Sequence, residues 1–175
     1  MAIPAVVPEV RMYEIERKFL IRRPLAEILA EAGQDVRRLT IAQCYLPDTG
    51  AWAIRARKRV SDDGQAFFLT MKARHSDVTN VEIETLVPQA VYDQIAALSG
   101  HDPLTKTRHV VGRWEIDQFL NPQLDGLVVA EIELTSEDEV FERPDWLGEE
   151  VTGQAAYANA AIARRLSAVI PAKGA

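Results

Sequence analysis

Three charged side chains near the start of the chain, Glu14, Glu16 and Lys18, occupy every second position of the stretch 13–21. Apolar residues take most of the positions between them, which is the period-2 pattern of a β-strand. Residues two apart on a strand share one face, about 6–7 Å from each other. Two carboxylates and one ammonium group therefore project in line from one face. A single strand of this kind is also typical of a sheet that shows its polar face to water.

The same alternation returns on later predicted strands, and on each of them the charges have one sign. Clustered bases suit a polyanion, and clustered carboxylates suit a hard divalent cation such as Mg²⁺ or Mn²⁺. Together they are typical of a metal–polyphosphate site, in which bases hold the phosphates and carboxylates hold the metal. The basic pairs are Arg55/Arg57, Lys72/Arg74 and Lys106/Arg108, and the acidic pairs are Glu14/Glu16, Glu82/Glu84, Glu115/Asp117 and Glu131/Glu133.

The elements that must position these charges are mostly strands joined by short turns. Strands are expected over 10–22, 38–46, 52–60, 66–74, 80–84, 104–111, 114–117 and 128–135, and helices over 24–33, 88–98 and 155–169. Residues 1–9 are expected to be a loose lead-in, and 144–148 a loop. The hairpin signal at 61–64 and the other short connections favour antiparallel pairing.

The faces opposite the charges are apolar and aromatic, so helices must cover them; Trp52 and Trp114 are expected to pack there. The resulting fold class is α+β: an eight-stranded antiparallel closed β-barrel, or tunnel, with a polar charged lumen and helices packed on the outside. Arg59 and Arg74 fit either the lumen or the surface. The last helix is expected to pack on the barrel, and a plug in one mouth is an alternative hypothesis.

Length, net charge and cysteine count limit the possible domain organisation, partners and location of the protein. A chain of 175 residues suits one domain, with its core over about 10–168. The net charge of −6 argues against a nucleic-acid partner, because such domains usually carry a basic excess. The single cysteine, Cys44, can form no intrachain disulfide. No long apolar run or signal peptide is present, so we expect a cytoplasmic protein without a membrane partner.

The order of these motifs resembles that of the CYTH domain proteins, or triphosphate tunnel metalloenzymes, over about residues 13–166. The family hallmark Glu-x-Glu-x-Lys is matched by Glu14, Glu16 and Lys18. One departure is Asn80, where many members carry an arginine. The further matching motifs are Arg55-Ala-Arg57, Leu69-Thr-Met-Lys72, Glu82-Ile-Glu84, Lys106-Thr-Arg108, Trp114-Glu-Ile-Asp117, Ala130-Glu-Ile-Glu133 and the segment 146–152 with Tyr157 and Asn159.

The resemblance implies a tunnel that binds triphosphates and cleaves them with a divalent metal, Mg²⁺ or Mn²⁺. It assigns catalytic roles to Lys18, Lys72, Glu82 and Glu84. It assigns phosphate binding to Lys18, Arg55, Arg57, Lys72, Lys106 and Arg108. It assigns metal binding to Glu14, Glu16, Glu115, Asp117, Glu131 and Glu133. Attack by a metal-oriented water needs no Ser, Cys or His nucleophile.

The function expected from these residues is hydrolysis of a triphosphate, with inorganic tripolyphosphate cleaved to pyrophosphate and phosphate as the first choice. Class IV adenylate cyclase and thiamine triphosphatase are the enzymatic alternatives. A polyphosphate-binding module without activity is the alternative of another class. The expected partner is a small triphosphate molecule, and the sequence leaves monomer or homodimer open.

Overall fold

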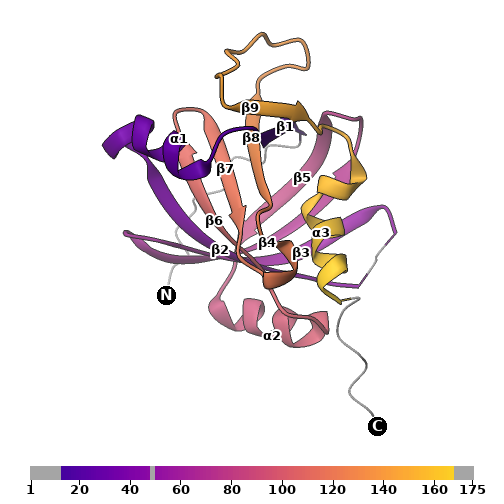
Figure 1. Cartoon of the computed structure of the whole chain (residues 1–175). Helices are drawn as coiled ribbons and strands as arrows, with labels where there is room; N and C mark the ends of the chain where they lie inside the picture. The colour runs from indigo at the N-terminus through magenta and orange to yellow at the C-terminus, as the bar shows by residue number, and fades with distance from the viewer. Residues whose placement is uncertain (1–12, 48–49, 168–175) are drawn as a thin grey trace, which may run out of the picture.

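The computed structural model describes residues 13–47 and 50–167, so the expected lead-in over 1–9 lies outside the described residues. Eight strands form a closed barrel in the order β5-β4-β3-β2-β6-β7-β8-β1, and β1 pairs in turn with β5 (Figure 1). Every pairing is antiparallel, which confirms the expected fold class. The strands are β1 (Tyr13–Ile21), β2 (Arg37–Tyr45), β3 (Trp52–Ser61), β4 (Gly64–Arg74), β5 (Thr79–Leu86), β6 (Leu104–Val111), β7 (Trp114–Phe119) and β8 (Val128–Leu134).

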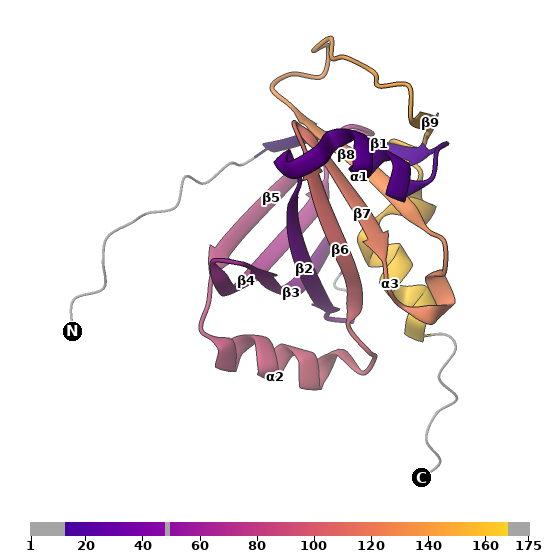
Figure 2. The same cartoon turned by 60° about the vertical axis from the view of Figure 1, so that its left-hand side comes forward.

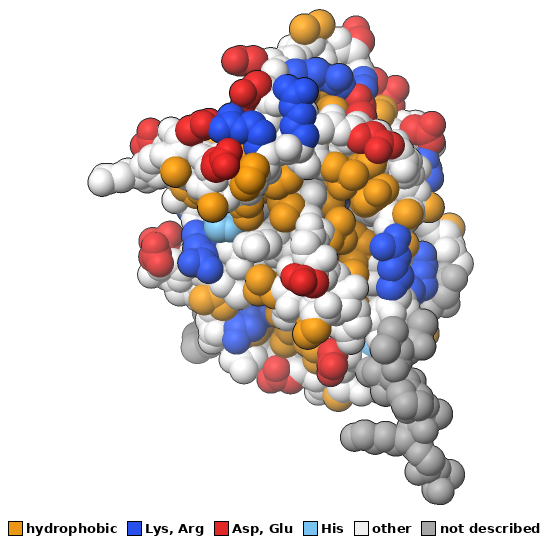
Figure 3. All heavy atoms as spheres, viewed as in Figure 1, with side chains coloured by type: hydrophobic (Ala, Val, Ile, Leu, Met, Phe, Trp, Pro, Cys, Tyr) orange, Lys and Arg blue, Asp and Glu red, His pale blue; other side chains and the backbone are white. Residues whose placement is uncertain are grey.

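A ninth strand, β9 (Leu147–Glu150), pairs with the end of β1, so the prediction of a loop over 144–148 was wrong at its last two residues. A Cβ at Gly148 would lie 3.0 Å from the carbonyl oxygen of Leu20, so a larger residue would require the paired backbone to shift. Arg17 on β1 also binds Glu150 at 2.9 Å. Charged side chains of both signs gather over β9 and the loop before it (Figure 3). The absence of a side chain at Gly148 thus permits close pairing of β9 with β1.

The strand register places the alternating charges on the inner face. Lys18 lies directly opposite Glu131, and Arg108 lies directly opposite Asp117. Residues that are directly opposite in an antiparallel pair share a face. The charged side chains of β1, β6, β7 and β8 therefore all enter the lumen, as the alternation predicts.

Two helices cover the outer face of the barrel (Figure 2). Helix α1 (Leu25–Ala32) ends at Gly33, whose φ of 66° suits glycine, and its Ile28 joins a core cluster with Phe19 and Trp114. Trp114 thus packs as expected, whereas Trp52 is 37% exposed and that prediction was wrong.

Helix α2 (Gln89–Ser99) covers a different part of the barrel. Its Tyr92 packs on Cys44, Ala56 and Phe67, which belong to β2, β3 and β4. Burial of these side chains against the outer face fixes α2 to the sheet.

Helix α3 (Asn159–Ser167) covers one end of the barrel. Its buried Ile162 and Leu166 pack with Leu104, Phe119 and Val129, whose registers place them on the inner face. The expected helix over 155–169 is divided into the 3₁₀ turn η3 (Ala155–Tyr157) and α3, and its last two residues lie outside the described residues. The short turns η1 (Gly33–Asp35) and η2 (Pro122–Leu124) complete the fold. Among the described helices, none is both long and apolar enough to cross a membrane.

Candidate active site

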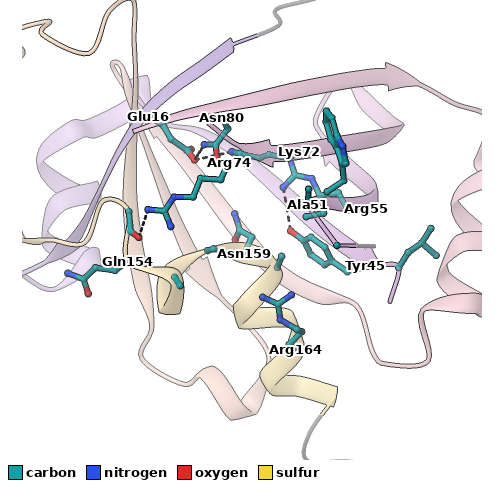
Figure 4. Close-up of a pocket in the computed structure, with 18 of the residues that line it drawn as sticks. Glu16, Tyr45, Ala51, Arg55, Lys72, Arg74, Asn80, Gln154, Asn159 and Arg164 are labelled. Carbon is teal, nitrogen blue, oxygen red and sulfur yellow. Dashed lines mark hydrogen bonds and ion pairs between the residues drawn. The ribbon is translucent and has the colours of Figure 1, made fainter. Parts of the chain in front are cut away.

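A cavity of about 510 Å³ lies beside α3, at the end of the barrel that this helix covers. Inward-facing residues of β1, β3 and β4 form one wall, and the start of α3 forms another (Figure 4). Four of the predicted site residues line it: Glu16, Lys18, Arg55 and Lys72. These four inward-facing residues therefore share one wall of the cavity.

Carboxylates from two strands surround Lys72 of β4. Its Nζ donates to Glu14 and, at 2.9 Å, to Oε1 of Glu16, and it lies 3.7 Å from Glu82. Burial, and next the neighbouring Glu16, raises the pKa of Glu14 to about 7. Burial opposes the charge of Lys72, but the Glu16 and Glu14 carboxylates outweigh it and raise the pKa of Lys72. The lysine is therefore a firmly charged group among crowded carboxylates.

A second group of ion pairs fills the lumen between β6, β7 and β8. Asp117 binds Lys106 Nζ and two nitrogens of Arg108, the latter at 2.6 and 2.7 Å. The side chains of Lys106 and Asp117 are both 0% exposed. Burial lowers the pKa of Lys106 to about 8. Although burial acts the other way on Asp117, Arg108 and Lys106 lower its pKa. Glu131 connects this group to the cavity, since it binds Arg108 at 3.1 Å and Lys18 at 2.5 Å.

The two arginines of β3 differ in their partners. Arg57 binds both oxygens of Glu84, and Thr70 donates to the same carboxylate at 2.7 Å. Arg55 instead donates to the hydroxyl of Tyr45 at 3.5 Å, and the carboxylate nearest to it, that of Glu82, lies 3.9 Å away. The Arg55 guanidinium is therefore the less compensated of the two, and it is the one that lines the cavity.

Sequence reasoning missed several residues that line the cavity. Tyr45 could have been found, because it shares the inner face of β2 and lies directly opposite Arg55. Arg164 of α3 has no strand alternation to reveal it. Arg74, which the sequence left open, lines the cavity and is half-exposed, with Asp77 and the Gly153 carbonyl as partners.

The other residues singled out in the sequence lie in different environments. Asn80 donates to Glu16 at 3.2 Å, so an amide occupies this part of the wall. Arg59, the other residue left open, is exposed with its guanidinium 4.9 Å from the centre of the Phe68 ring. The predicted site residues that do not line the cavity are Glu14, Arg57, Glu82, Glu84, Lys106, Arg108, Glu115, Asp117, Glu131 and Glu133.

The carboxylates suit a hard divalent cation in their chemistry. Glu16 lies directly opposite Glu133, and Glu115 directly opposite Glu131. Like charges in such positions are destabilising unless a cation lies between them. Oε2 of Glu82 is also buried without a hydrogen-bond donor. All these donors are oxygens, as Mg²⁺ and Mn²⁺ prefer.

The arrangement of these carboxylates is set by bases. Within 13–47 and 50–167, no group of three or more acidic, histidine or cysteine side chains is disposed to hold a metal ion. The carboxylates bind Lys18, Lys72 and Arg108 instead. To bind a metal ion, these carboxylates must therefore release their ion pairs with the basic side chains.

A closed antiparallel barrel with acidic and basic side chains on its inner face defines the class of tunnel proteins. The sequence pattern of the CYTH domain matches residues 12–166. The chain therefore belongs to the CYTH domain family, whose members are in general metal-dependent.

Two relatives are similar over most of their length. An inorganic triphosphatase of Acetivibrio thermocellus is 31% identical over 156 residues, which cover 86% of this chain and 93% of the relative. An inorganic triphosphatase of Nitrosomonas europaea is 30% identical over 162 residues, which cover 87% of this chain and 97% of the relative.

Solved structures agree with the fold. The crystal structure of the inorganic triphosphatase NE1496 superposes with a TM-score of 0.58 at 28% identity, over 86% of this chain and 93% of that one. The PH1819 protein from Pyrococcus horikoshii shares the fold, with a TM-score of 0.51 at 20% identity over 71% of this chain and 80% of that one.

Proposed function

We propose that this chain is a divalent-metal-dependent triphosphatase that hydrolyses inorganic tripolyphosphate to pyrophosphate and phosphate. The observation that carries the proposal is the cavity of about 510 Å³ in which Lys18, Arg55 and Lys72 meet beside Glu16. Three bases suit a highly charged phosphate chain, and an adjacent carboxylate suits its metal. Both relatives described above are named inorganic triphosphatases, which supports the same substrate.

The six proposed phosphate-binding residues divide into two groups by position. Lys18, Arg55 and Lys72 reach the cavity directly. Arg55 makes only long contacts, 3.5 Å to the Tyr45 hydroxyl and 3.9 Å to Glu82, so it would exchange little to bind a phosphate oxygen. Further inside the lumen, Arg57, Lys106 and Arg108 are held by carboxylates and add positive potential behind the substrate.

We assign metal binding, by Mg²⁺ or Mn²⁺, to Glu14, Glu16, Glu115, Asp117, Glu131 and Glu133. A bound divalent ion would polarise the phosphoryl oxygens and favour deprotonation of the attacking water. Glu82 would orient that water through its Oε2, which accepts no hydrogen bond from the described residues. Glu84 would hold Arg57, and Lys18 and Lys72 would stabilise the charge on the transferring phosphoryl group. The proposed location is the cytoplasm, where the one cysteine would stay reduced.

The test is phosphate release from tripolyphosphate, ATP, thiamine triphosphate and pyrophosphate, each with Mg²⁺, Mn²⁺ or a chelator. Metal-dependent release that is greatest from tripolyphosphate would support the proposal. A cyclic nucleotide and pyrophosphate from ATP would identify a cyclase instead, and preference for thiamine triphosphate would identify the other enzymatic alternative. Binding without turnover of any substrate would leave a polyphosphate-binding module.

A matched pair of variants separates the site from the rest of β3 and β4. Lys72→Gln removes the cavity lysine and should abolish most activity, because Lys72 would contact the transferring phosphate. Lys58→Gln removes the same charge from the outer face of β3, where Lys58 lies 6.0 Å from the centre of the Phe67 ring. This control should keep wild-type activity, and equal activity of both variants would argue against the site.

A further inference from the structure

The cavity collects positive charge in a chain whose net charge is −6. Among the described residues, five bases line the cavity against two carboxylates, so its wall carries an excess of three positive charges. The bases are Lys18, Arg55, Lys72, Arg74 and Arg164, and the carboxylates are Glu16 and Asp77. A cleft lined mainly by one sign of charge attracts ligands of the opposite sign.

Arg164 differs from the other four bases of the cavity in its element and in its partners. It lies on α3, whereas the other four lie on strands. The partners of the strand bases are Glu131 for Lys18, Glu16 for Lys72, Tyr45 for Arg55 and Asp77 for Arg74. Arg164 is exposed, and within the described residues its guanidinium forms no hydrogen bond or ion pair. A phosphate oxygen can therefore bind Arg164 without displacing another group of the protein.

Helix α3 places Arg164 in the outer part of the cavity. Asn159, at the start of the helix, lies 3.4 Å from Nζ of Lys106 in the lumen. Arg164 follows later in the same helix, about 7.5 Å further along its axis. Ala160 and Arg164 are one turn apart, so they share a helix face, and both line the cavity. Figure 4 shows Arg164 across the cavity from Lys72 and Arg55, so a ligand between the two walls meets bases from both.

We propose that Arg164 binds the phosphate farthest from the reacting one and thereby favours tripolyphosphate over nucleoside triphosphates. This inference rests on the proposed function, since it assigns specificity to the same cavity. Lys18 and Lys72 hold the transferring phosphoryl group at the strand wall, so the other end of the substrate lies toward α3. In tripolyphosphate this end is a free terminal phosphate, whereas in a nucleoside triphosphate it is the α-phosphate, which is esterified to ribose. The arginine binds the free terminal phosphate more strongly, because that phosphate carries more charge and presents more free oxygens to the guanidinium.

The experiment compares two neighbouring arginines of α3. Arg164→Met removes the charge but keeps a long side chain that suits a helix. Arg165→Met is the matched control, because Arg165 does not line the cavity and its guanidinium donates to the carbonyl of Ala156 at 2.5 Å. Titration calorimetry with tripolyphosphate, and competition of ATP against it, measure both affinities without turnover when a chelator is present.

The two variants should differ in their preference between the two ligands. Arg164→Met should bind tripolyphosphate about tenfold more weakly, through loss of one charge-assisted contact, and ATP no more than about twofold more weakly. Arg165→Met should match the wild type with both ligands, and Arg164→Lys, which keeps the charge, should recover part of the affinity for tripolyphosphate. In steady-state rates with Mg²⁺, Arg164→Met should raise KM for tripolyphosphate more than it lowers kcat, because Arg164 does not contact the reacting phosphate.

The outcomes separate the inference from the proposed function. Unchanged affinity of Arg164→Met for tripolyphosphate, or an equal loss for tripolyphosphate and ATP, would overturn the inference even if the wild type hydrolyses tripolyphosphate. An equal loss in Arg165→Met would also overturn it, because the effect would then come from the total charge of α3. Failure of the wild type to bind or hydrolyse tripolyphosphate would overturn the proposed function, and the inference with it.

Discussion

Asp117 is the residue whose neutralisation should damage the barrel most. Its carboxylate compensates Lys106, which is 0% exposed, and also binds Nε and Nη2 of Arg108 at 2.7 and 2.6 Å. Asp117→Asn keeps the size of the side chain but removes the charge and presents an N–H₂ group to one of the two cations. Arg108 would keep its ion pairs with Glu115 and Glu131, whereas Lys106 would lose the carboxylate that compensates it.

The magnitude follows from burial. Removing one partner of a buried ion pair costs about 3–5 kcal/mol, because the other charge stays buried without compensation. For a chain of this length, such a loss lowers Tm by roughly 6–20 °C. Glu31→Gln is the control, since it removes the same charge from an ion pair with Arg23 in which Glu31 is 59% exposed. An exposed pair contributes only about 0–1 kcal/mol.

Urea unfolding followed by circular dichroism, at a pH near 7, measures both variants. Asp117→Asn should shift the midpoint far more than Glu31→Gln does. In the double variant Asp117→Asn/Lys106→Met the loss should be smaller than the sum of the single losses, because the uncompensated ammonium is gone. A loss below about 1 kcal/mol for Asp117→Asn would refute the reasoning that this pair is buried and mutually dependent.

Three further predictions concern the cavity. The pKa of Glu14 is raised from 4.5 to about 7, so between these values the folded state binds more protons than the unfolded chain, and this group makes stability fall as the pH rises. Glu14→Gln should therefore gain stability relative to the wild type from pH 5 to pH 7 in urea unfolding, and parallel curves would count against it. Lys18→Met should weaken binding of metal-free tripolyphosphate by about tenfold or more in calorimetry, through loss of a charge-assisted contact; unchanged affinity would exclude Lys18 from the phosphate site. Glu131→Gln should raise the Mg²⁺ or Mn²⁺ concentration for half-maximal activity by about tenfold, and an unchanged requirement would remove Glu131 from the metal ligands.

Much of the fold and part of the site could be predicted from the alternation of residue types. Charges at every second position determine which side chains share a face of one strand, because the period of a strand is a local property. This is why the sequence assigns Glu16, Lys18, Arg55 and Lys72 to one inner surface. In the structure these four residues line the cavity. Closure of the sheet followed from the need to cover the apolar faces and remove the edges.

The sequence could not determine which charges are compensated and which are left for a ligand. Arg55 and Arg57 occupy equivalent positions in the pattern, yet Arg57 binds both oxygens of Glu84, whereas Arg55 donates to Tyr45 and lies 3.9 Å from Glu82. Those partners lie on different strands and depend on the register between them. The pairing of β9 also depends on tertiary structure, because only the folded chain brings Gly148 against the carbonyl of Leu20.

The sequence by itself therefore determined the barrel, its charged lumen and the set of residues that face inward. Only the tertiary structure decided the place of the cavity, the pairing of its bases and the position of α3 across one end. The physical reason is range. Hydrophobic and charge periodicity relate residues two to four apart, whereas ion pairing and cavity shape depend on contacts between different elements, such as Lys106 with Asp117 or Lys72 with Glu16.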